Sequence, residues 1–176
     1  MGSLRFIFGL FAFLFSTMLF AQEEEAILWN SGQRLSWANF KAEPPKNTEI
    51  AATTASGLSY QFSTTEENGK YELDYIVSTF FYPNRSWYQA NICDEVILSH
   101  EQLHFDISEL YARKMRKIMD NTTFTKNVKA EVKAIYRQIN KELAEFQQVY
   151  DRETNYSRNI EQQLSWNKKI KEALAK

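Results

Sequence analysis

The chain of 176 residues has two histidines, His100 and His104, and they stand four residues apart. Residues at positions i and i+4 lie on the same face of an α-helix, one turn apart. Ile97, Ile107 and Tyr111 recur at helical spacing around them, so an apolar stripe follows the same side. The segment is therefore predicted to be a helix that turns both imidazoles toward the interior.

Helical patterns fill the second half of the chain. Asp94 is a suitable N-cap for the histidine helix, which we expect to end near Met119. A second helix is predicted at residues 126–150, because apolar residues recur there every three or four positions. A third helical stretch is indicated by Ile160, Leu164, Ile170 and Leu174.

The first half of the chain carries the strand signals. Residues 50–63 are rich in Thr, Ser and aromatic residues, and residues 70–81 alternate between an apolar and a polar face. Asn68 and Gly69, between the two runs, tolerate positive φ and are typical of a hairpin turn. The chain is therefore expected to be an α+β domain. Its small antiparallel sheet in the N-terminal half would pack on the histidine helix and two further C-terminal helices.

Residues 1–21 have the composition of a secretory signal peptide. Arg5 supplies a positive start, an apolar run follows, and Ala21 is a small residue before a suitable cleavage point. An uncleaved membrane anchor is the alternative, but the apolar run is short for a span of about 20 residues. We therefore expect a cleaved signal at residues 1–21 and a single domain at residues 22–176. The mature protein is predicted to be secreted or periplasmic, without membrane contact.

The charges of the chain exclude one class of partner. Lys and Arg number 21, Asp and Glu number 22, and the basic residues are dispersed, so no nucleic-acid surface is predicted. Cys93 is the single cysteine, which rules out an intramolecular disulfide. An exported domain without disulfides depends for its stability on its core or on a bound metal.

The histidine helix contains the run His100-Glu101-Gln102-Leu103-His104, a pattern that binds metal in metallopeptidases and that arises by chance here roughly 0.1 % of the time. Both imidazoles can reach one zinc ion at about 2.0–2.1 Å. Glu101 would lie beside the open coordination position, where it can take a proton from water and pass it to a leaving amine. We predict Zn²⁺ as the cofactor, His100 and His104 as ligands, and Glu101 as the catalytic base.

A catalytic zinc ion normally takes three protein ligands, and the motif supplies two. No further histidine exists, and the position six residues after His104 is Leu110, which excludes the metzincin ligand pattern. Acidic residues on the downstream helices are candidates, although each could equally be a solvated helix charge. They are Glu131, Glu142, Glu145, Asp151 and Glu153.

Residues 98–107, Leu-Ser-His-Glu-Gln-Leu-His-Phe-Asp-Ile, resemble the signature of a bacterial exported family, the domain of unknown function 922 family, described as zinc-dependent proteases. The likeness extends to residues 35–40, 51–53, 86–87 and 150–154 and to Trp166, and so to nearly all of the chain after the signal. Together with the motif, the resemblance implies a zincin-like domain and a secreted zinc-dependent peptidase.

The resemblance also suggests where the third ligand lies. In the family, a histidine commonly follows the Tyr-Asp-x-x-Thr segment by two residues and would be the natural third ligand. That position here is Tyr156, which becomes the first choice because metal charge promotes deprotonation of a phenol. Asp151 and Glu153 are the alternatives, and a member without the histidine could also bind metal poorly.

Two further hypotheses concern the surroundings of the motif. Asp106 could hold a ligating histidine in its correct tautomer, or it could be a surface charge. The strand at residues 70–81 closely precedes the histidine helix, so an edge of its sheet could hold an extended peptide by strand addition.

The leading functional prediction is a zinc metallopeptidase that acts on a peptide or protein substrate. The alternative is a non-catalytic zinc-binding or interaction module that retains the motif helix without turnover. A third interpretation is a purely structural domain without metal.

Overall fold

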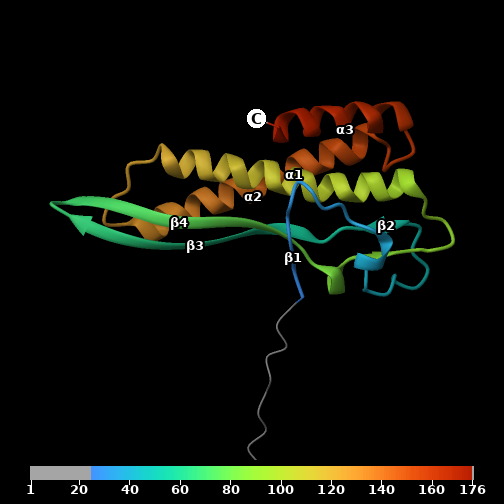
Figure 1. Cartoon of the computed structure of the whole chain (residues 1–176), viewed down its shortest axis with the longest axis horizontal. Coiled ribbons are helices and arrows are strands. Elements are labelled where there is room, and N and C mark those ends of the chain that lie inside the picture. Colours follow the sequence, from blue (N-terminus) through green and yellow to red (C-terminus); the bar gives the residue numbers. More distant parts are fainter. Residues whose placement is uncertain (1–24, 176) are drawn as a thin grey trace, which may run out of the picture.

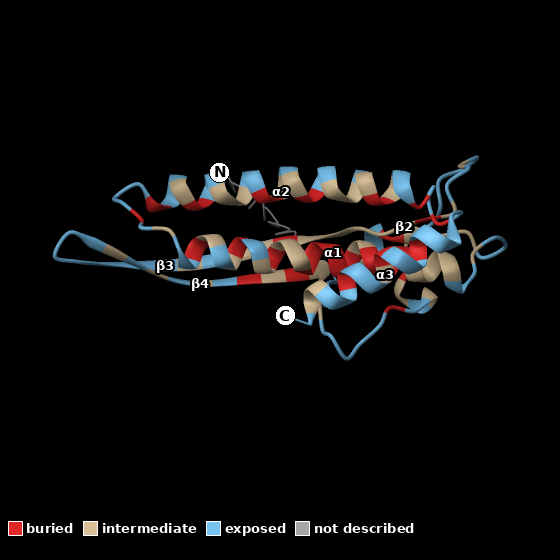
Figure 2. Ribbon diagram, turned by 90° about the horizontal axis from the view of Figure 1, so that it is seen from above, coloured by how far each residue is buried: buried red, intermediate tan, exposed pale blue. Residues whose placement is uncertain are grey.

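The helices form one layer of the structure, and a long antiparallel hairpin forms the other (Figure 1). In the computed structural model, which describes residues 25–175, the helices are α1 (Glu95–Asp120), α2 (Val128–Glu153) and α3 (Ile160–Leu174). α1 lies between α2 and α3 (Figure 2) and also packs against the hairpin. The predicted α+β class, with strands early and helices late, is confirmed.

The predicted signal peptide at residues 1–21 lies outside the described residues. Within residues 25–175, no helix is both long enough and apolar enough to cross a bilayer.

The hairpin joins β3 (Ser56–Glu67) to β4 (Lys70–Phe81) through a two-residue turn. Asn68 and Gly69 form this turn with φ angles of 52° and 76°, as the sequence predicts. β1 (Ile27–Leu28) pairs with the end of β4, so the sheet order is β1-β4-β3. The odd-numbered residues of β4 are the more buried ones, which confirms the predicted apolar face.

The strand predicted from residue 50 onward is divided between two sheets. β2 (Ala52–Thr53) pairs with β5 (Trp87–Tyr88) in a separate small sheet, and β3 begins after a break. At this break Ala55 donates its N–H to Ser86 Oγ and accepts the N–H of Tyr82 at its carbonyl, both at 2.9 Å. These hydrogen bonds to the segment after β4 divide the predicted strand into two. The alternation of residues 50–63 does not predict the break, because the bonding partners are distant in the sequence.

Each helix begins and ends close to its predicted limits. The Asp94 side chain caps α1 by accepting the N–H groups of Val96 and Ile97 at 3.0 and 2.9 Å. α2 begins later than predicted and continues beyond residue 150 to Glu153. This last turn of α2 matters because it carries Asp151.

α3 buries a different face from the one that its aliphatic residues suggest. Ile160 and Leu164 are 57 % and 63 % exposed, whereas Gln163, Trp166 and Ile170 are buried. Trp166 and Ile170 belong to the main core, and Gln163 lies on the same side of the helix. A polar amide is therefore drawn into the interior with them.

The main core lies between α1 and the elements around it. Ile107 and Met115 of α1 are fully buried and belong to one apolar cluster with Ile139 of α2 and Val77 of β4. A second cluster joins the N-terminal segment to β4 and α1. It consists of Leu35, Phe40, Phe81 and Phe105. Two short 3₁₀ helices lie in the adjoining stretches of the chain, η1 (Trp37–Asn39) in the N-terminal segment and η2 (Pro83–Arg85) after β4.

Tyr75 connects β4 to the end of α1. Its hydroxyl donates to the carbonyl of Arg116 at 2.9 Å and also bonds the carboxylate of Asp120. Burial, followed by the hydrogen bond to Asp120 and the charge of Asp120, raises the pKa of Tyr75 from 10.0 to about 12. The folded state thus favours the protonated phenol. The resulting stabilisation is complete below pH 10 and is lost as the pH rises toward 12.

We expect Tyr75→Phe to lower the free energy of unfolding by about 1 kcal/mol at neutral pH, because one hydroxyl hydrogen-bond donor is lost. The difference from wild type should shrink once the pH exceeds 10, since the phenol then ionises in the unfolded chain. Urea unfolding of both proteins between pH 7 and pH 11 measures it. A difference that stays constant over this range would contradict the assigned bonding.

Candidate metal centre

His100 and His104 project from the N-terminal half of α1 toward the last turn of α2. Their Nε2 atoms lie 3.3 Å apart, as the i, i+4 spacing on a helix allows. His100 is 4 % exposed, and the side chain of His104 is 13 % exposed. Both imidazoles therefore face one small and largely buried space, as the sequence predicts.

Asp151, in the last turn of α2, completes a triangle of donor atoms. Its Oδ1 atom lies 2.9 Å from Nε2 of His104 and 3.2 Å from Nε2 of His100. Tetrahedral zinc holds N and O ligands at about 2.0–2.2 Å, which places pairs of donor atoms about 3.3–3.5 Å apart. The measured separations are close to this value, so a small divalent ion fits among the three atoms with little movement. We call these three residues the donor triangle.

The electrostatics of the donor triangle favour a cation at its centre. Burial raises the pKa of Asp151, but the hydrogen bonds to His100 and His104 hold this pKa well below its usual range. Burial lowers the pKa of His104, yet the hydrogen bond to Asp151 and the charges of Glu101 and Asp151 raise it on balance. Both shifts have the same cause, which is carboxylate charge facing the imidazole nitrogens.

Glu101 lies close enough for its charge to act on His104, and it is 5 % exposed. Its Oε2 atom is the one buried side-chain N or O atom in the described structure that has no hydrogen-bond partner. Such an oxygen destabilises a fold, because its lost hydration is not replaced, and its presence therefore indicates a functional role. Thr54 Oγ1 donates to the backbone carbonyl of Glu101 at 3.2 Å. Glu101 thus presents a free basic oxygen inside the centre, which suits a donor set that binds a metal and a water.

Tyr156, the predicted third ligand, lies in the turn after α2, with a φ angle of 52°. It is 62 % exposed, and within residues 25–175 it makes no hydrogen bond to either imidazole. Glu153, the other alternative, accepts the indole N–H of Trp166 at 2.9 Å. Of the three candidate third ligands, the structure therefore places Asp151 beside the two histidines. The physical reason is that residues 155–157 all have positive φ and turn the chain away from the end of α2.

Tyr150, the residue before Asp151, packs its ring against the ring of His100. The two rings are stacked with centroids 4.5 Å apart, and the Tyr150 hydroxyl donates to the carbonyl of His100 at 3.2 Å. Burial, opposed by the hydrogen bond to Gln163 and supported by nearby carboxylates, raises the pKa of Tyr150. Tyr150 is therefore a neutral hydroxyl donor. Neither the helical pattern of residues 126–150 nor the resemblance at residues 150–154 predicts this role.

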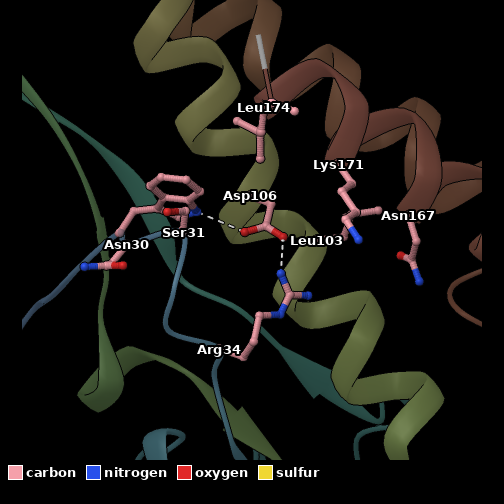
Figure 3. A pocket seen from close by; sticks show the side chains of 10 residues that line it. Asn30, Ser31, Arg34, Leu103, Asp106, Asn167, Lys171 and Leu174 are labelled. Carbon is pink, nitrogen blue, oxygen red and sulfur yellow. Dashed lines mark hydrogen bonds and ion pairs between the residues drawn. The ribbon is translucent and has the colours of Figure 1, made fainter.

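Asp106 holds the N-terminal segment rather than a histidine (Figure 3). Its carboxylate accepts Trp29 Nε1 at 2.9 Å, Arg34 Nη1 at 2.8 Å and Gln102 Nε2 at 2.9 Å. It is 6 % exposed, so it is not a surface charge either. Both hypotheses for Asp106 were wrong, because the position of the N-terminal segment cannot be read from the helix alone.

A cavity of about 510 Å³ opens beside Asp106, between the N-terminal segment and α3 (Figure 3). Its walls include Trp29, Arg34, Asn167 and Lys171, but none of the residues of the donor triangle. The candidate site is therefore identified by its converging donor atoms and not by this hollow.

The family model described as "Bacterial protein of unknown function (DUF922)" matches residues 30–158. This range includes Glu101 and the whole donor triangle, and it ends before α3. Neither the curated proteins nor the solved structures include a match to the chain, so the zincin-like assignment stays a prediction. Because the match covers most of the sequence, the chain belongs to the DUF922 family of bacterial proteins of unknown function.

Proposed function

We propose that this protein is a zinc-dependent peptidase that acts outside the cytoplasm after removal of the predicted signal peptide. The proposal rests on one observation: His100, His104 and Asp151 converge beside the unpartnered carboxylate oxygen of Glu101. Two imidazoles, one carboxylate and an adjacent base are the donor set of hydrolytic zinc sites. The imidazoles also favour zinc over Mg²⁺ and Ca²⁺, which prefer oxygen ligands.

The three ligand side chains would hold the ion and leave one coordination position open. When bound, zinc supplies a Lewis acid and lowers the pKa of a coordinated water to about 7. Glu101 accepts a proton from the attacking water at Oε2 and then donates it to the amine of the cleaved peptide bond. The burial of Glu101 keeps solvent from competing for this oxygen.

β2 offers a place for the backbone of the substrate. It pairs with β5 along one edge, and among the described residues no strand pairs with its other edge. Thr54 directly follows β2 and its hydroxyl bonds the carbonyl of Glu101, so the end of β2 lies close to the helix turn that carries the proposed base. An extended peptide that adds to β2 would pass the donor triangle with its backbone hydrogen-bonded.

The predicted place for the substrate was an edge of the sheet that contains β4, and the last residues of β4 are paired on both sides. β3 pairs with the whole of β4, and β1 pairs with Phe80 and Phe81 on the other side. Arg116 also donates to the carbonyl of Val77 at 3.0 Å. We therefore propose β2, rather than this end of β4, as the edge that receives the substrate.

Metal binding tests the donor triangle. We expect the metal-free wild type to bind one Zn²⁺ per chain and Asp151→Asn to bind it at least about 100-fold more weakly, because a charged ligand is lost. Tyr156→Phe should bind zinc within about twofold of wild type, because an exposed phenol adds no ligand. Competition with a chromophoric chelator measures the affinities, and thermal unfolding of the metal-free proteins verifies folding. Zinc retained by Asp151→Asn but lost by Tyr156→Phe would restore Tyr156 as the ligand.

Hydrolysis of quenched fluorescent peptides from a random library tests the role of Glu101. Glu101→Gln should lower kcat/KM by about 10²–10⁴-fold, because the proton acceptor is removed, while zinc binding is retained. Glu95→Gln is the matched control, since Glu95 is an exposed glutamate in the first turn of the same helix. Its kcat/KM should equal that of wild type.

The alternative function, a zinc-binding module without turnover, predicts a different pattern. Wild type would bind zinc stoichiometrically and cleave none of the peptides, and Glu101→Gln would behave identically. Hydrolysis that survives in Glu101→Gln would exclude the proposed mechanism. A wild type that binds no zinc after metal-free purification would exclude both functions.

A further inference from the structure

The buried side-chain amide of Gln163 contacts His100 at Nδ1, the ring nitrogen that faces away from the donor triangle. Nδ1 of His100 lies 3.0 Å from Oε1 of Gln163, a residue of α3 that is 2 % exposed. A glutamine on a helix surface normally stays in water, because burying its amide is unfavourable unless every polar atom is bonded. The bonds of Gln163 therefore need an explanation.

In the structure the amide oxygen of Gln163 faces His100 and Tyr150, and its amide nitrogen faces Asn167. Its Nε2 group donates to Oδ1 of Asn167 at 2.9 Å, and Nδ2 of Asn167 donates to Oγ of Ser99 at 2.9 Å. Oε1 of Gln163 also accepts the hydroxyl of Tyr150 at 2.9 Å. An amide oxygen only accepts hydrogen bonds, so the ring nitrogen that faces it must carry the hydrogen.

The direction of the amide determines the tautomer of His100. A neutral imidazole carries one N–H, and with the hydrogen on Nδ1 the lone pair is on Nε2. Nε2 is the atom that lies 3.2 Å from Asp151 and 3.3 Å from His104. In this tautomer Nε2 of His100 can bind a metal ion but cannot donate to Asp151, so metal binding and the Nε2–Asp151 hydrogen bond are alternatives, and Gln163 favours the first.

We infer that Gln163 is a positioning residue of the metal centre, and that it holds His100 in the tautomer that can bind metal. The inference rests on the proposed zinc site and adds α3 to it. α3 supplies no ligand, but it carries both Gln163 and the Asn167 that orients Gln163. Hydrogen-bond partners of ligating histidines typically change metal affinity by about 10–100-fold when they are removed.

Three variants of the full chain test the inference. Gln163→Met keeps the size of the side chain and removes the acceptor, whereas Gln163→Glu keeps an acceptor oxygen and adds a charge. Gln162→Met is the matched control, because Gln162 is the exposed neighbour on the same helix. For each protein, zinc affinity is measured by chelator competition, and stability by urea unfolding without metal. Long-range ¹H–¹⁵N spectra of the metal-free proteins, at a pH where the imidazole is neutral, report the tautomer of His100.

Zinc affinity and metal-free stability should rank the two Gln163 variants in opposite orders. We expect Gln163→Met to bind zinc about 10–100-fold more weakly, Gln163→Glu to bind at least as tightly as wild type, and Gln162→Met to match wild type. Gln163→Glu should be the least stable without metal, because it buries a charge. The spectra should show hydrogen on Nδ1 of His100 in wild type and a mixture of tautomers in Gln163→Met.

Equal zinc affinity of wild type and Gln163→Met would overturn the inference. So would affinities that follow the stabilities of the metal-free proteins, since that result indicates a structural role alone. If the wild type binds no zinc, the proposed function fails. The tautomer of His100 in the metal-free proteins then decides by itself whether Gln163 positions the ring.

Discussion

α1 is enclosed by the other elements, yet much of its buried surface is polar. Each buried polar group needs a partner, because leaving one unbonded destabilises a fold by about 1–3 kcal/mol. Gln102 accepts the N–H of Leu35 at 2.7 Å, and Glu109 accepts the hydroxyl of Thr79 at 2.8 Å. The N-terminal segment and β4 are thus fixed to the helix by polar contacts as well as by the core.

One turn of α1 departs from this rule, and it is the turn that carries the metal motif. Glu101 keeps a buried oxygen without a partner, and the Nε2 atoms of His100 and His104 face a carboxylate and each other. The partners of the remaining atoms are well defined: Nδ1 of His100 is bonded, and its ring is stacked on Tyr150. The surrounding helices therefore leave the Glu101 oxygen without a partner and gather both imidazole Nε2 atoms around Asp151, so the atoms that a metal and a water would use lie together.

The predictions that hold are those that depend on a few neighbouring residues, such as the Asn68-Gly69 turn, the Asp94 cap and the histidine spacing. Asp151 could only be one alternative among several, because its place depends on how α2 packs along α1 and on where its last turn ends. Gln163 gave no signal at all, since a glutamine on a helix is ordinarily a solvated residue. The candidate ligands on one helix are thus predictable from the sequence, whereas the groups from other helices that join them require the tertiary structure.

With Asp151 as the proposed third ligand, the charge of the proposed centre is also determined. Two neutral imidazoles with the carboxylates of Asp151 and Glu101 carry two negative charges, which a divalent ion balances. A histidine in the third position would leave one positive charge in a buried site, and burying an unbalanced charge is unfavourable. When Glu101 takes a proton from water, the proton only moves within the centre, so the total charge stays at zero. Negative charge that develops on the attacked carbonyl oxygen comes from the same water, and the balance therefore holds throughout the proposed reaction.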